Sequence, residues 1–151
     1  MLNLQLHFQD DPILRQNTVT IDYTEEGLNE LIEAMMELAK TKNGVGLAAP
    51  QIGILKKLIV VKNIENNTFF EMLNPEIYWV SYDKDCKQEG CLSVVDGNTS
   101  ITKNIWRYNR IRVKWQDRNG VEFDELIKDR LLSRIIQHEI DHLNGKLIID
   151  Y

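Results

Sequence analysis

The segment QHEIDH, at residues 137–142, constrains the fold of this 151-residue chain more than any other feature. His138 and His142 are four residues apart, so both imidazoles lie on one face if the segment is helical, with Glu139 beside the first. Two imidazoles one turn apart can bind the same metal ion, and the adjacent glutamate can act as a general base. Because such an ion needs a further protein ligand, another segment must fold back onto this helix.

The third ligand has to come from upstream of the helix. Only nine residues follow His142, too few for the later helix that carries a glutamate ligand in thermolysin-like proteases. Ile148 stands where a metzincin protease has its third histidine. Cys91, in EGCLS, is the best candidate, because a thiolate binds zinc or ferrous iron well and Gly90 allows close backbone approach. The alternatives are that Cys91 is a small buried hydrophobic residue and that His7 supplies the ligand.

A glycine-rich segment, GVGLAAPQIG at residues 44–53, lies between a predicted helix and a predicted strand. It lacks the GK[ST] ending of a phosphate-binding loop. Gln51 could offer its side-chain amide to an oxyanion. The alternative is a helix C-cap followed by an ordinary loop.

Hydrophobic periodicity predicts an α+β fold in one domain that covers residues 1–151. One helix is expected after an N-cap at Thr24 and before Asn43, and a second from Asp129 to Leu143. Strands are expected at residues 58–61, 69–73, 76–82, 111–116, 121–126 and 146–150. We therefore expect mostly antiparallel strands around a central metal-binding helix, with one further N-terminal helix.

Charge and composition exclude some classes of protein. The net charge of −5 argues against direct nucleic-acid binding. No apolar run is long enough to span a membrane, and the N-terminus lacks the pattern of a secretion signal. Cys86 and Cys91 are therefore expected as free thiols in the cytoplasm. We expect Cys86 to be structural, and oxidation that links it to Cys91 to be a liability.

Three motifs in order, GVGLAAPQ, EGCLS and QHEIDH, resemble the signature motifs of peptide deformylases. DDPILR (residues 10–15) and RIRVKWQDRNG (residues 110–120) also resemble segments of that family, so the resemblance covers nearly the whole chain. It implies removal of the N-formyl group from the N-terminal methionine of newly synthesised polypeptides, with release of formate. The alternatives are another small metal-dependent amidase or peptidase on the same scaffold, and an inert metal-binding module.

The resemblance also implies a role for individual residues. Cys91, His138 and His142 match the ligands of one divalent metal ion, which in this family is usually Fe²⁺, with Zn²⁺, Ni²⁺ or Co²⁺ as alternatives. Glu139 matches the general acid and base. The donors to the formyl oxygen match the Gln51 side chain and the Leu92 backbone N–H. Substrate-binding positions match Val45, Gly46, Glu89, Gly90, Leu131, Ile135 and Arg107. Arg134 lies beside these positions, and we expect it to extend to the pocket rim and to influence preference after methionine.

The resemblance is to a short form of the family that lacks a C-terminal helix, a form found in bacteriophages and a few bacteria. We expect a monomer in the bacterial cytoplasm, or in the host cytoplasm if the source is a phage. The expected partners are N-formylmethionyl nascent peptides, and transient contact with the ribosome remains open. Residues 94–106 are longer than the matching family segment, and their conformation is not predicted.

Overall fold

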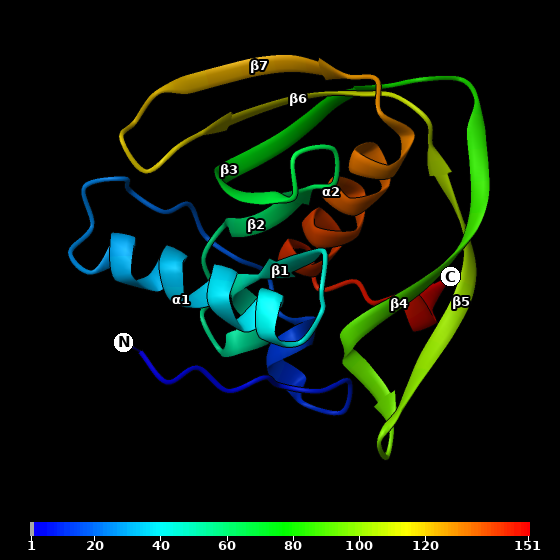
Figure 1. Cartoon of the computed structure of the whole chain (residues 1–151), viewed down its shortest axis with the longest axis horizontal. Coiled ribbons are helices and arrows are strands. Elements are labelled where there is room, and N and C mark those ends of the chain that lie inside the picture. The colour runs from blue at the N-terminus through cyan, green and yellow to red at the C-terminus, as the bar shows by residue number, and fades with distance from the viewer. Residues whose placement is uncertain (1) are drawn as a thin grey trace.

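The computed structural model describes residues 2–151 and has the predicted α+β fold (Figure 1). Within this range the α-helices are α1 (Leu28–Thr41) and α2 (Arg130–Leu143). The strands are β1 (Gly46–Ala48), β2 (Leu58–Asn63), β3 (Thr68–Val80), β4 (Lys84–Asp96), β5 (Thr99–Tyr108), β6 (Ile111–Gln116) and β7 (Glu122–Ile127). The short 3₁₀-helices are η1 (Pro12–Arg15), η2 (Ala49–Ile52) and η3 (Ile148–Asp150).

The named strands pair antiparallel and form two sheets. One sheet has five strands in the order β1-β2-β3-β6-β7, so β1 is an edge strand. Strands β4 and β5 pair with each other in a long ribbon on one side of the molecule (Figure 1). Helix α2 lies between the two sheets and contacts β1 and β2 as well as β5. This central position confirms the predicted arrangement of strands around the histidine-bearing helix.

Helix α2 begins and ends where the sequence predicts. The Asp129 carboxylate accepts the backbone N–H groups of Leu131 and Leu132 at 2.9 and 3.0 Å, which satisfies donors that have no partner inside the helix. Gly145, just beyond the helix, has a φ of +73°, a conformation that favours glycine. The buried side chains Ile135 and Ile136 pack into an apolar cluster with β2, β3 and β6.

Helix α1 begins later than predicted. Its first residue is Leu28, and its N-cap is Gly27. The expected N-cap, Thr24, instead donates its backbone N–H and its hydroxyl to the Asp22 carboxylate, which folds residues 22–25 into a turn. The buried face of α1 packs against the five-stranded sheet and forms a second apolar cluster.

Two predicted strands, residues 69–73 and 76–82, form the single strand β3. The register with β6 shifts between Leu73 and Glu76, and Asn74 has a φ of +53°. Asn74 and Pro75 therefore form an irregularity inside a continuous strand, where the sequence suggests a break.

The predicted strand at residues 146–150 is wrong, because the chain turns into η3 there. The backbone N–H of Leu147 donates to the Asp150 carboxylate at 2.8 Å, and Leu147 and Ile148 are buried against the β4–β5 side of the molecule. The apolar side chains of this segment are therefore buried by a turn, and the segment does not pair with a sheet.

The β4–β5 ribbon includes residues 94–106, for which the sequence predicts no element. Its strands expose many polar residues, and its inward apolar side chains are few, among them Val94 and Ile105.

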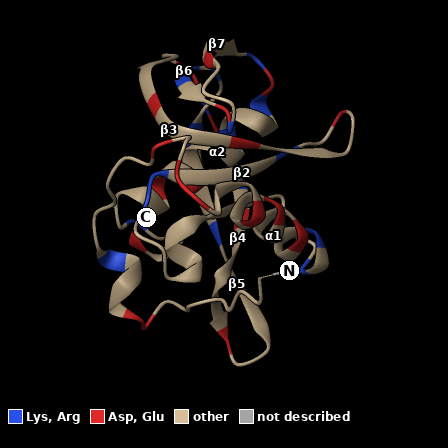
Figure 2. Cartoon of the chain, turned by 90° about the vertical axis from the view of Figure 1, so that its left-hand side faces the viewer, with Lys and Arg blue, Asp and Glu red and all other residues tan. Residues whose placement is uncertain are grey.

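Lys, Arg, Asp and Glu residues are interspersed over the elements seen in Figure 2. No helix among residues 2–151 has both the length and the apolar character required to cross a membrane.

Candidate active site and metal centre

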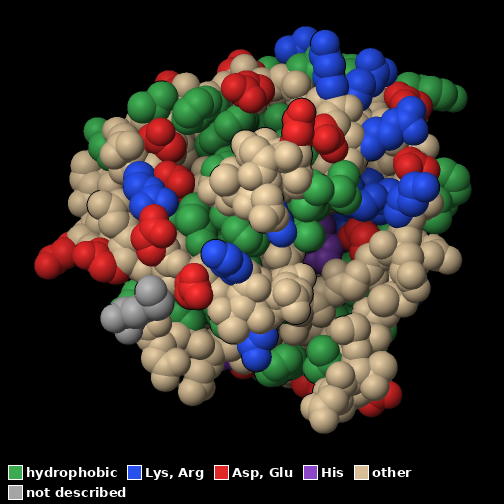
Figure 3. Space-filling view, in the orientation of Figure 1, with side chains coloured by type: hydrophobic (Ala, Val, Ile, Leu, Met, Phe, Trp, Pro, Cys, Tyr) green, Lys and Arg blue, Asp and Glu red, His purple; other side chains and the backbone are tan. Residues whose placement is uncertain are grey.

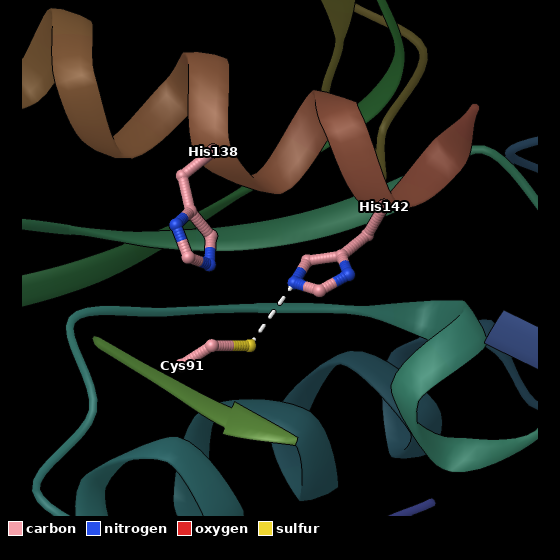
Figure 4. A group of neighbouring side chains, drawn as sticks. All are labelled: Cys91, His138 and His142. Atoms are coloured by element: carbon pink, nitrogen blue, oxygen red, sulfur yellow. Dashed lines mark hydrogen bonds between the residues drawn. The ribbon is translucent and has the colours of Figure 1, made fainter. Parts of the chain in front are cut away.

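Cys91, His138 and His142 come together although they lie on two separate elements. Cys91 is on β4, and the two histidines project toward it from α2 (Figure 4). One potential ligand atom from each residue lies within 4.8 Å of the others, and Cys91 Sγ is 3.4 Å from His142 Nε2. His7, the alternative ligand, is not in this group, because its Nδ1 bonds the Asp11 carboxylate at 2.6 Å.

The charges around this group favour a cation. Burial acts to lower the pKa of His138, but its hydrogen bonds to Cys91 and Glu89 raise that pKa well above 6.5. The negative charge of the Glu89 carboxylate would also favour a bound divalent ion. Burial and the charge of His138 hold the pKa of His142 well below 6.5, so His142 presents a neutral imidazole. One thiol and two imidazoles form a donor set that fits zinc, ferrous iron and related ions.

Glu89 determines which nitrogen of His138 faces the group. Burial acts to raise the pKa of Glu89, but hydrogen bonds from His138 and Arg107 lower it to about 2. An ionised carboxylate only accepts, so His138 Nδ1, 2.8 Å from Glu89 Oε1, carries the proton. Because Nδ1 is held by Glu89, Nε2 is the nitrogen that would bind a metal ion, which would take the place of its proton, as in other carboxylate–histidine–metal arrangements.

Glu139 lies beside the three potential ligands. Its Oε1 is 3.8 Å from His138 Nε2, and its side chain is almost fully buried. Burial raises the pKa of Glu139 to about 7. Gly46 of β1 packs against this carboxylate. A carboxyl group with a pKa near neutrality can both accept and return a proton.

The Gln51 side chain directs its amide N–H groups toward Cys91 and Ser93. Its Oε1 accepts the Ala48 backbone N–H at 2.9 Å, which fixes the orientation of the amide. Its Nε2 donates to Ser93 Oγ at 3.0 Å and lies 3.7 Å from Cys91 Sγ. Leu92 follows Cys91, where the pairing of β4 with β5 shifts register between Gly90 and Val95.

A cavity of about 350 Å³ opens beside this group. In Figure 3 a histidine side chain is visible inside a hollow on this face. Among the residues predicted from the sequence, those that line the cavity are Val45, Gly46, Gln51, Glu89, Gly90, Cys91, Leu92, Leu131, Arg134, Ile135, His138 and Glu139. Gly44, the first residue of the GVGLAAPQ motif, also lines the cavity. The sequence gives no site role to four further lining residues, and only their proximity to the motifs could have indicated them: Lys42, Asn43, Gln88 and Ser100.

The two arginines predicted at the substrate site, Arg107 and Arg134, turn inward. Arg107 does not line the cavity: it is buried, and its guanidinium donates to Glu89 and Asp141. Arg134 lines the cavity, but its guanidinium does not extend into solvent: only 8% of the residue is exposed, and it donates to Glu89 at 2.5 Å. Both side chains turn inward because the buried Glu89 carboxylate needs compensating charge.

Comparison with known proteins agrees with this geometry. A sequence model of the polypeptide deformylase family matches residues 4–151. The chain is 40% identical to a peptide deformylase of Bartonella quintana, over 93% of this chain and 79% of that protein. It superimposes on a probable peptide deformylase of Synechococcus phage S-SSM7 with a TM-score of 0.90 and 37% identity, over 99% of both chains. A class I type b peptide deformylase of Acinetobacter baumannii, solved with Met-Ala-Ser bound, gives a TM-score of 0.87 and 30% identity, over 99% of this chain and 98% of that one. This chain belongs to the polypeptide deformylase family.

Proposed function

We propose that this protein is a metal-dependent hydrolase that removes the N-formyl group from the N-terminal methionine of newly synthesised polypeptides. The observation that carries this proposal is the position of Glu139, which lies in one cavity with two members of the Cys–His–His group. Membership of the polypeptide deformylase family supports the same reaction. No feature of the site favours a different amidase or peptidase.

Cys91, His138 and His142 are the proposed ligands of the metal ion. When bound, the ion supplies a Lewis acid and lowers the pKa of a coordinated water. We propose Fe²⁺ as the ion in cells, and the same donor set accepts Zn²⁺, Ni²⁺ and Co²⁺.

Glu139 is the proposed proton carrier. It takes a proton from the water whose oxygen attacks the formyl carbon, and it returns the proton to the amine nitrogen as the C–N bond breaks. The products are formate and a peptide with a free N-terminus. Burial of Glu139 and its pKa of about 7 suit this exchange near neutral pH.

The formyl oxygen gains negative charge during the attack, and two N–H groups are proposed to stabilise it. One is the Gln51 amide, whose orientation the Ala48 N–H fixes. The other is the Leu92 backbone N–H, which lies outside the regular β4–β5 ladder. One such donor typically contributes ~3 kcal/mol to the stability of a transition state.

The substrate peptide is proposed to bind as an added strand. Strand β1 is an edge of its sheet, and Val45 and Gly46 line the cavity beside it. The methionine side chain would contact Leu131 and Ile135, with Glu89 and Gly90 on the opposite wall. The Acinetobacter relative was solved with Met-Ala-Ser bound, which supports a peptide as the ligand. We further propose that the protein acts as a monomer in the cytoplasm.

Formate release from formyl-Met-Ala-Ser tests the proposed reaction. The protein would be loaded with Fe²⁺ without oxygen, and acetyl-Met-Ala-Ser would serve as the control substrate. Formate release, with no hydrolysis of the acetyl peptide, is the expected result. Equal hydrolysis of both peptides would instead identify a general amidase.

A further inference from the structure

Arg134 is a buried cation that the proposed reaction does not use. It lies on α2 four residues before His138, so both side chains leave the same face of the helix. Its Nη1 donates to Glu89 Oε2 at 2.5 Å and to the Ile105 carbonyl at 2.9 Å. Its Nη2 donates to the Asp85 carbonyl at 2.6 Å. These bonds join α2 to both strands of the β4–β5 ribbon.

The four contacts on Glu89 hold both of its oxygens. Oε2 accepts from Arg134 Nη1 at 2.5 Å and from Arg107 Nε at 2.9 Å. Oε1 accepts from Arg107 Nη2 at 2.9 Å and from His138 Nδ1 at 2.8 Å. Arg107 holds the carboxylate in a bidentate pair, and its Nη1 also donates to Asp141 at 2.6 Å. Arg134, anchored on two backbone carbonyls, gives Glu89 a second fixed partner.

We propose that Arg134 is a positioning residue of the metal centre. It holds Glu89 in place, and Glu89 in turn fixes the ring orientation of His138 so that Nε2 faces Cys91. This inference rests on the proposed metal-dependent function. It replaces the role at the pocket rim that the sequence suggests for Arg134. Partners of this kind typically change metal affinity by about 10- to 100-fold when they are removed.

A purely structural role is the alternative, because loss of one partner of a buried ion pair destabilises a protein whatever its function. Arg118 provides a matched control. It too pairs with carboxylates of other elements, donating to Glu71 at 3.0 Å and to Glu33 at 2.7 Å, and it does not line the cavity. Arg118→Gln should therefore lower stability without an effect on the metal.

The test compares the parent with Arg134→Gln and Arg118→Gln in Co²⁺ binding. Affinity would be measured in competition with a coloured chelator, well below the melting temperature of each variant, together with the visible absorption of bound Co²⁺. We expect Arg134→Gln to weaken Co²⁺ binding about 10-fold and to shift the absorption bands. Arg118→Gln should bind within about twofold of the parent, with the same spectrum.

Parent-like affinity and spectrum in Arg134→Gln would overturn the inference alone. Absence of Co²⁺ binding by the parent would overturn the proposed function and this inference with it. If the glutamine variant does not fold, Arg134→Met retains the side-chain volume and removes the buried charge. The same weakening is expected there, and unchanged affinity would again overturn the inference.

Discussion

Gly46 of β1 lies directly against the carboxylate of Glu139 on α2. A Cβ atom at position 46 would stand 2.8 Å from Oε1 of Glu139 and 2.9 Å from its Cγ. Such a distance is shorter than van der Waals contact allows, so a side chain at position 46 must displace Glu139 or the strand. The second glycine of the GVG motif is therefore needed for steric reasons, because a side chain at this position would collide with Glu139.

Gly46→Ala is expected to lower kcat/KM for formyl-Met-Ala-Ser by about 100-fold, because a catalytic group moved by ~1 Å loses about that much. Metal content should remain at the parent value. The matched control is Gly27→Ala, where an added Cβ meets nothing within 4 Å. Its positive φ of +81° should cost about 1 kcal/mol of stability, with activity retained. Full activity in Gly46→Ala would contradict the close contact.

Ile135 and Ile136 belong to the same apolar cluster but differ in their contact with the pocket. Both are buried, but only Ile135 lines the cavity. Ile135→Val should reduce the preference for formyl-Met over formyl-Phe peptides roughly 10-fold, because a wider pocket admits the larger side chain. Ile136→Val removes the same methylene group from the core and should leave the preference unchanged. Equal changes in the two variants would argue against the proposed pocket.

Cys86 and Cys91 cannot form the disulfide that the sequence suggested as a liability. Both lie on β4, and five residues of strand span about 16 Å, whereas the Cα atoms of a disulfide lie within about 7 Å. Peroxide should therefore inactivate the Cys86→Ser variant at the parent's rate. Slower inactivation of the variant would show that Cys86 takes part.

Stability should depend on pH through Glu71. Burial acts to raise the pKa of Glu71, but hydrogen bonds from Arg118 lower it below 4.5 overall. A lowered pKa in the folded state contributes stability above the unfolded value, and this stability is lost as pH falls through the folded value. Glu71→Gln should lower the free energy of unfolding of the metal-free protein by about 1 kcal/mol at pH 7, a value reduced by solvent screening.

The difference between parent and Glu71→Gln should shrink as pH falls below 4.5, because the parent carboxylate then takes up a proton. Urea denaturation at several pH values measures it. Glu65→Gln, at an exposed residue between β2 and β3, is the control and should show no such trend. A difference that stays constant between pH 7 and pH 3 would contradict the ion-pair account.

The sequence predicts the site better than the details of the fold. Spacing alone places His138, His142 and Glu139 on one helix, and the capping residue Asp129 marks where that helix begins. Cys91 could be added as a candidate third ligand from its chemistry, whereas its grouping with Gln51 depended on the family motifs. Local patterns could not reveal the turn at Asp22, because a threonine before an apolar-periodic segment is by itself a good N-cap. Only the structure shows that Thr24 bonds Asp22 and that the helix begins later.

Buried charged residues are the second feature that the sequence did not predict. The sequence favours accessible positions at the substrate site for Arg107 and Arg134, since arginine is rarely buried without a partner. Their partner, Glu89, lies on another element, and only the tertiary structure brings the three together. The β4–β5 ribbon was missed for a similar reason: its stability comes from pairing between strands and from a few buried apolar residues, with little alternation in sequence.

The proton-carrying role of Glu139 is the central claim, and Glu139→Gln tests it most directly. The variant retains the size of the side chain but cannot accept a proton. Metal content per chain and formate release from formyl-Met-Ala-Ser would be measured on the same Fe²⁺-loaded preparations of parent and variant. We expect unchanged metal content and a kcat lowered by at least about 100-fold. A metal-loaded Glu139→Gln protein with parent-like turnover would contradict the account.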